Sequence, residues 1–222
     1  MATRLPHFRR LDRREFACPA DYMPLLALMP LLAITLAGCN RGPQRVTVPT
    51  FDPVQMTQEA FDKNDADHNG SLDARELSAW PGLRAAIPMI DVNKDSKIDQ
   101  DELKAHLESY QIGRIGLQSL TCFVTVGGKP LDGAIVEFHP EEFMQERIKA
   151  AHATTNSDGA GFVLPIEKGL PGIQPGIYRV TISKKNGDRE MLPKRYNAET
   201  ELGFVVSSAS GGAPAQFKLD PR

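Results

Sequence analysis

The sequence predicts a multidomain chain, helical and then β, in which a small helical part precedes an antiparallel β-sandwich. Three observations predict this. An arginine-preceded apolar run ends near residue 38, two acidic twelve-residue repeats lie between residues 57 and 110, and apolar and polar residues alternate from residue 118 onward. The expected boundaries are residues 1–38 for an N-terminal signal segment, 39–56 for a tether, 57–110 for the helical part, 111–117 for a hinge and 118–222 for the sandwich.

The composition is that of an ordinary globular protein of one or two domains. Of the 222 residues, 24% are charged and 41% are hydrophobic, and the formal net charge is −2. Because no strongly basic balance is present, the sequence does not indicate a nucleic-acid partner. Among the cysteines, we expect Cys18 to be removed with the signal segment and Cys122, in a strand-like run, to be a buried small hydrophobe.

The N-terminal residues have the pattern of a secretory signal. Five arginines precede an apolar run over residues 23–36, which matches the basic and apolar regions of such signals. The run contains Pro24 and Pro30 and is shorter than the about 20 residues of a membrane-spanning helix. We expect residues 1–38 to be removed. The pair Arg13-Arg14 weakly resembles a twin-arginine motif, so the general secretory and twin-arginine export routes both stay open.

The apolar run ends in Leu36-Ala37-Gly38-Cys39, which resembles the lipobox of bacterial lipoproteins. The resemblance implies cleavage before Cys39 and acylation of that cysteine. Two buried acyl chains suffice for stable anchoring, so the chain is expected to be held on a membrane of the bacterial cell envelope, facing the periplasm or the surface. Residues 40–55 are proline-rich and are expected to form an extended tether.

The two acidic repeats, residues 65–76 and 91–102, have the spacing of a calcium-binding loop. Each carries side-chain oxygens at positions 1, 3, 5, 9 and 12, and Ca²⁺ takes six to eight oxygen ligands at about 2.3–2.6 Å. The predicted ligands of the first loop are Asp65, Asp67, Asn69, Ser71 through its carbonyl, Asp73 and Glu76. Those of the second loop are Asp91, Asn93, Asp95, Lys97 through its carbonyl, Asp99 and Glu102.

These repeats resemble the paired loops of EF-hand proteins, over roughly residues 57–110. Gly70 stands at position 6, where positive φ is required, but Ser96 occupies that position in the second loop. A non-glycine residue in the left-handed region costs about 1–2 kcal/mol, so weaker binding is expected there. The resemblance also implies that Leu72 and Ile98 pair the two loops through a short β-bridge.

Helices are expected around the loops from start signals and apolar spacing. Thr57 is the expected N-cap of the entering helix, and Pro81 and Pro88 are expected to cut the intervening helices short. The helical segments are predicted at residues 57–63, 74–80 and 100–110, and Leu83, Ile87 and Ile90 recur at helical spacing on a further short helix.

Residues 118–222 are predicted to form short strands separated by turns, with a helical insert at residues 141–152. Three segments carry a further resemblance: Gly128–Phe138, Thr155–Phe162 and Pro175–Val180. They are similar to the carboxypeptidase-regulatory-like, or transthyretin-like, domains of planctomycete-type envelope lipoproteins. This resemblance implies an Ig-like sandwich with a binding or scaffolding role and no chemistry.

No catalytic motif is found in the sequence, so no enzymatic activity is expected. A transition-metal site formed by His139 and His152 with Glu141, Glu142 and Glu146 is conceivable, but a solvated helix face is the preferred interpretation.

The expected protein is therefore a calcium-binding, lipid-anchored envelope monomer whose calcium is structural. Its expected partners are the membrane, through Cys39, and an envelope protein or polysaccharide. The alternatives are an accessory subunit of an envelope hydrolase or an unrecognised hydrolase, and a metal-free structural spacer.

Overall fold

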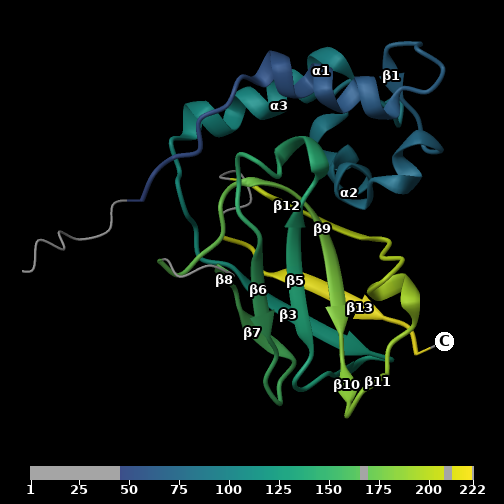
Figure 1. Ribbon diagram of the computed structural model, residues 1–222, viewed down its shortest axis with the longest axis vertical. Helices are drawn as coiled ribbons and strands as arrows, with labels where there is room; N and C mark the ends of the chain where they lie inside the picture. Colours follow the sequence, from purple (N-terminus) through teal and green to yellow (C-terminus); the bar gives the residue numbers. More distant parts are fainter. Residues whose placement is uncertain (1–45, 166–169, 208–211, 222) are drawn as a thin grey trace, which may run out of the picture. The chain divides into compact units, whose positions relative to one another are not determined.

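The computed structural model describes residues 46–165, 170–207 and 212–221, and the predicted signal segment and Cys39 lie outside them. In these residues the chain forms three α-helices and several antiparallel sheets (Figure 1). The helical region consists of α1 (Pro53–Asn64), the 3₁₀ turn η1 (Glu76–Ala79), α2 (Pro81–Ile90) and α3 (Gln100–Gly113).

Helix α1 begins at Pro53, not at Thr57 as predicted. Asp52 is its N-cap, and the Asp52 carboxylate accepts the backbone N–H of Val54 at 2.9 Å, while Pro53 takes the first helical turn where its missing N–H costs nothing. Thr57 lies inside the helix, where its hydroxyl donates to the carbonyl of Pro53 at 2.8 Å. The end of the predicted tether is therefore already helical.

The prolines of α2 act differently from the prediction. Pro81 begins the helix rather than ending one, and Pro88 lies inside it without stopping it before Ile90. The predicted exit helix over residues 74–80 is only the single 3₁₀ turn η1. Its Leu77 is fully buried, so the short turn still contributes to the core.

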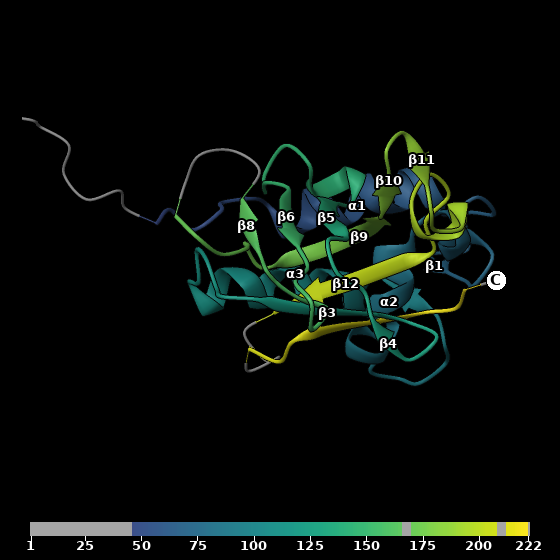
Figure 2. The ribbon, with the colours of Figure 1, turned by 90° about the horizontal axis from the view of Figure 1, so that it is seen from below.

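The β region contains two larger sheets (Figure 2). The five-stranded sheet is antiparallel and has the order β12-β9-β5-β6-β8; the second has the order β13-β3-β4, with β7 also paired to β3. β13 runs parallel to β3, which period-two alternation does not predict. The strands of the first sheet are β5 (Ile135–Pro140), β6 (Ala151–Thr154), β8 (Leu164–Pro165), β9 (Gly176–Ser183) and β12 (Leu202–Val206). Those of the second are β3 (Thr121–Val126), β4 (Lys129–Pro130), β7 (Ala160–Phe162) and β13 (Ala215–Leu219).

Two small two-stranded sheets complete the structure. β1 (Ser71–Leu72) pairs with β2 (Ile98–Asp99), and β10 (Lys185–Asn186) pairs with β11 (Arg189–Glu190).

The inner faces of the two larger sheets share one apolar core. The ring of Phe138 in β5 lies 6.2 Å from that of Phe217 in β13 and 6.3 Å from that of Tyr178 in β9. Alternate residues of β5, and of β9 from Tyr178 onward, are buried as the alternation predicts, and Cys122 is buried as expected. This mixed helix and sheet structure is compatible with a β-sandwich in the second half of the chain.

The predicted helical insert at residues 141–152 is wrong. The segment contains only the 3₁₀ turn η2 (Glu142–Met144) and then enters strand β6 at Ala151. Met144, Ile148 and Ala151 recur at helical spacing, but all are buried in an irregular segment and a strand. Apolar residues at helical spacing therefore do not require a helix, because an irregular segment can also bury Met144, Ile148 and Ala151.

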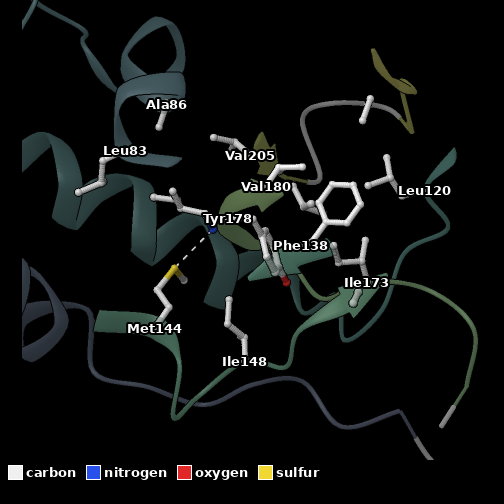
Figure 3. Packing of buried hydrophobic residues seen from close by; sticks show 14 of the residues in the cluster. Leu83, Ala86, Leu120, Phe138, Met144, Ile148, Ile173, Tyr178, Val180 and Val205 are labelled. Atoms are coloured by element: carbon white, nitrogen blue, oxygen red, sulfur yellow. Dashed lines mark hydrogen bonds between the residues drawn. The ribbon is translucent and has the colours of Figure 1, made fainter. Parts of the chain in front are cut away.

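The helical region packs on the β region through α2. Leu83 and Ala86 of α2 belong to the same buried cluster as Val205 of β12 (Figure 3). Gly203 of β12 permits this approach, since a Cβ there would overlap the carbonyl oxygen of Pro81. Residues 42–222 accordingly form one compact unit.

Glu141 caps the N-terminus of α2 from the β region. Trp80, the N-cap residue, makes no capping bond with its side chain, and the Oε1 atom of Glu141 accepts the backbone N–H of Gly82 at 2.6 Å. Glu141 is only 4% exposed. Burial raises the pKa of this carboxyl to about 7, although the Gly82 N–H and the positive charge of Arg179 lower it.

This burial predicts a pH dependence of stability. Because the folded-state pKa of Glu141 is raised, its stabilising contribution is fully present below the ordinary value of 4.5 and is lost as pH rises through about 7. The free energy of unfolding of the wild type, relative to that of Glu141→Gln, should fall by about 3 kcal/mol at most between pH 4.5 and 8. Urea unfolding at several pH values measures this difference.

Glu142→Gln is the matched control, because Glu142 is adjacent but exposed and pairs with Lys63 at 3.1 Å. The prediction would be contradicted if the difference in free energy of unfolding between the wild type and Glu141→Gln did not change between pH 4.5 and 8.

Candidate metal centre

The first acidic loop connects α1 to η1 and is closed at both ends by backbone hydrogen bonds. Asp65 is the C-cap of α1, and its N–H donates to the carbonyl of Phe61 at 2.9 Å. Gly70 has a φ of +82°, which lets the chain turn sharply at the predicted position. Leu72 then pairs with Ile98 of the second loop, so the predicted β-bridge is confirmed.

Three of the predicted ligands converge in this loop. Oxygen atoms of Asp65, Asp67 and Glu76 lie within 4.8 Å of one another, and Asp65 is only 7% exposed. Carboxylates this close repel one another when all are ionised, unless a cation lies between them. The donor atoms are all oxygens, which is the ligand type that hard divalent cations prefer.

The loop's own N–H groups orient these carboxylates. The two oxygens of Asp65 accept the N–H groups of Asn69 and Gly70 at 3.1 and 2.9 Å. Glu76 accepts the N–H of Ala66 with one oxygen at 2.8 Å and that of Asp73 with the other at 2.9 Å. Backbone hydrogen bonds of the loop therefore fix the orientation of the Asp65 and Glu76 carboxylates.

One oxygen of Asp73 faces the start of η1, and Asp73 is not among the three carboxylates that lie within 4.8 Å of one another. Its Oδ1 atom accepts the N–H groups of Glu76 and Arg75 at 3.1 and 2.7 Å. These backbone hydrogen bonds lower the pKa of Asp73. Asn69 uses its side-chain oxygen to accept the N–H of Ser71 at 2.8 Å.

The second loop repeats the hydrogen bonds of the first at equivalent positions. Asp91 accepts the N–H groups of Asp95 and Ser96 at 3.2 and 2.9 Å, as Asp65 does in the first loop. Glu102 accepts the N–H groups of Val92 and Asp99 at 2.9 and 3.0 Å, as Glu76 does. Two loops of different sequence thus fold alike, which the residue spacing alone did not establish.

In the second loop Asn93 stands at position 3, where the first loop has Asp67. Within the described part of the chain, the cluster of Asp65, Asp67 and Glu76 is the one group of at least three acidic, histidine or cysteine side chains close enough to hold a metal. In the second loop the amide of Asn93 donates to Asp95 and Asp99 at 3.2 and 3.3 Å. Burial, followed by the charges of Asp95 and Glu102, raises the pKa of Asp99.

Both loops contain non-glycine residues with positive φ that the sequence did not fully reveal. Ser96 has a φ of 65°, as its loop position predicts. His68 and Lys94, both at position 4, have φ values of 55° and 63°; histidine is enriched at positive φ, whereas lysine is not.

The residues of the alternative transition-metal site do not form one cluster. His139 lies in β5, where its Nε2 atom is 3.3 Å from Glu137, and His152 lies in the neighbouring strand β6. Glu141 is buried against α2, and Glu142 pairs with Lys63. The solvated helix face that was the preferred alternative is not present either, since the insert is not a helix.

No protein-family model, curated protein or solved structure matches the chain, so this site is interpreted from its own geometry. Among the residues that the structure describes, no helix is long and apolar enough to cross a membrane.

The strained serine of the second loop yields a prediction about the metal-free protein. Ser96→Gly should increase the free energy of unfolding by about 1 kcal/mol, because glycine adopts a φ of 65° without steric cost. Urea unfolding in the presence of a chelator measures this change.

The reverse change in the first loop is the control. Gly70→Ser should destabilise the chain by a similar amount, since Gly70 has a φ of +82°. A Ser96→Gly variant no more stable than the wild type would show that the second loop is not strained.

Proposed function

We propose that the chain binds calcium through its two acidic loops, which form an EF-hand pair. The observation that carries this proposal is the convergence of Asp65, Asp67 and Glu76 within 4.8 Å. The shared hydrogen bonds of the two loops and the bridge between Leu72 and Ile98 support it. The all-oxygen donor set favours calcium over the transition metals that prefer histidine or cysteine.

A bound calcium ion would be held by oxygen ligands from each loop. In the first loop the ligands are those predicted from the sequence, with Glu76 closing the shell at position 12. In the second loop, Asn93 would have to turn its amide oxygen toward the ion, and the amide's present bonds to Asp95 and Asp99 oppose this. We therefore propose tighter binding at the first loop.

The calcium is proposed to be structural. Extracellular calcium modules typically bind at about 10⁻⁴–10⁻³ M, so the sites of an exported protein would stay filled. Binding to the folded state alone stabilises it by about 2.7 kcal/mol when calcium is at one hundred times the dissociation constant.

The metal-free spacer remains the second candidate, because part of the loop geometry has another explanation. Asp99 and Glu102 form a capping box at the start of α3, and Asp73 and Glu76 exchange equivalent bonds at η1. Helix capping therefore accounts for these four acids without metal. It does not account for Asp65 and Asp67, which the first loop places beside Glu76.

We further propose that the chain is an envelope lipoprotein anchored through Cys39, with the β region as a non-catalytic interaction module. The support is the sequence pattern that ends at Cys39. In cells that process lipoproteins, Cys39→Ser should move the protein from the membrane fraction to the soluble fraction. An unchanged distribution would contradict the anchor.

Calorimetric titration of calcium into the metal-stripped chain tests the proposed function. Two sites of unequal affinity are expected. Glu76→Gln should weaken the tighter site by about tenfold or more, because even outer-shell partners of a metal are worth 10–100-fold in affinity. Glu102→Gln should weaken the other site.

Glu108→Gln is the matched control, since this glutamate lies on α3 outside both loops. Absence of binding heat at millimolar calcium, with no rise in melting temperature, would contradict the proposal and favour the metal-free spacer.

A further inference from the structure

Residues 141–148, here called the docking segment, join the helical region to the β region. On one side the segment is part of the β-region core. The Sδ atom of Met144 accepts the N–H of Ile177 at 3.4 Å, and Ile148 packs against Gly176, leaving no room for a Cβ at that position (Figure 3). Met144 and Ile148 are both buried.

On its other side the docking segment contacts α1 and the start of α2. Phe143 is only 2% exposed, and its ring centre lies 6.2 Å from that of Trp80. Arg147 makes a two-pronged ion pair with Glu59 of α1, at 3.1 and 3.3 Å. Glu141 of the same segment also caps α2 by accepting the N–H of Gly82. The docking segment therefore contacts the helical region through an aromatic ring, an ion pair and a helix cap.

The elements contacted are those that lead into the acidic loops. Helix α1 ends at Asp65, the first residue of the first loop, and Trp80 follows η1, which begins at Glu76. Helix α2 has Asp91, the first residue of the second loop, as its C-cap. A shift of α1 relative to the docking segment therefore moves the start of the first loop, and a shift of α2 moves the start of the second.

We infer that the docking segment is the internal target of the EF-hand pair, so that calcium binding and the packing of the helical region on the β region are energetically coupled. In calcium-sensing EF-hand proteins, calcium exposes an apolar groove that receives a helix of another protein. Here Phe143 already covers the apolar surface beside Trp80. This inference rests on the proposed calcium binding and names what that binding regulates.

The coupling must act in both directions. If calcium favours the packed arrangement, then weakening the packed arrangement lowers the affinity for calcium by the same factor. Couplings of this kind typically change affinity by about 5–150-fold. A residue of the docking segment that touches no ligand should therefore affect calcium binding.

The test is calcium titration of the full chain by calorimetry, comparing the wild type with Phe143→Ala. We expect at least about fivefold weaker binding in the variant, because the ring that covers Trp80 is removed. Phe123→Ala is the matched control: Phe123 is 38% exposed in β3, and the same truncation there should leave calcium affinity unchanged.

Arg147→Met provides a second variant in case Phe143→Ala does not fold. It breaks the ion pair with Glu59 and keeps most of the side-chain volume, so weaker calcium binding is again expected. Affinities equal to the wild-type value in the folded variants would overturn the coupling and leave the proposed function standing. No calcium binding by the wild type would overturn both.

Discussion

The crowding of carboxylates in the first loop is the constraint on which the helical region depends. Two unit charges about 4 Å apart repel by about 1 kcal/mol in water and about 4 kcal/mol at the effective dielectric of a protein surface. Oxygen atoms of Asp65, Asp67 and Glu76 lie within 4.8 Å of one another, and each carboxylate accepts a backbone N–H group of the loop. A divalent cation would turn this repulsion into attraction, and the proposed calcium function follows from that reversal.

Helix α2 connects the two acidic loops to the β region. It lies between them in sequence, it is capped at its start by Glu141, and it packs on β12 where Gly203 allows close approach. The helical region has too few apolar residues to make a large core of its own. The β region supplies apolar surface through β12, so the stability of the helical region depends on its packing against the sheet.

Much of this structure could be predicted from local patterns, because local patterns determine it. The proposed loop ligands were assigned from a fixed spacing and stay a prediction, whereas the bridge between Leu72 and Ile98, expected from pairing the loops, is confirmed. The strands β5 and β9 were visible because one face of each is buried and side chains alternate across a strand.

The features that were missed depend on contacts between distant residues. The docking segment looked helical because Met144 and Ile148 are spaced like a helix face, but they pack against Ile177 and Gly176 of β9 from a segment that is not an α-helix. The capping of α2 by Glu141 joins residues far apart in the chain, and no local pattern encodes it. The parallel pairing of β13 with β3 likewise depends on the return of the chain from its C-terminal end.

The most direct test of the central claim is a crystal structure determined with calcium, using anomalous scattering to locate the ion. We expect an ion in the first loop with oxygens of Asp65, Asp67 and Glu76 at about 2.3–2.6 Å, and a less occupied ion in the second loop. An ordered first loop without an ion at saturating calcium would contradict the proposed calcium binding.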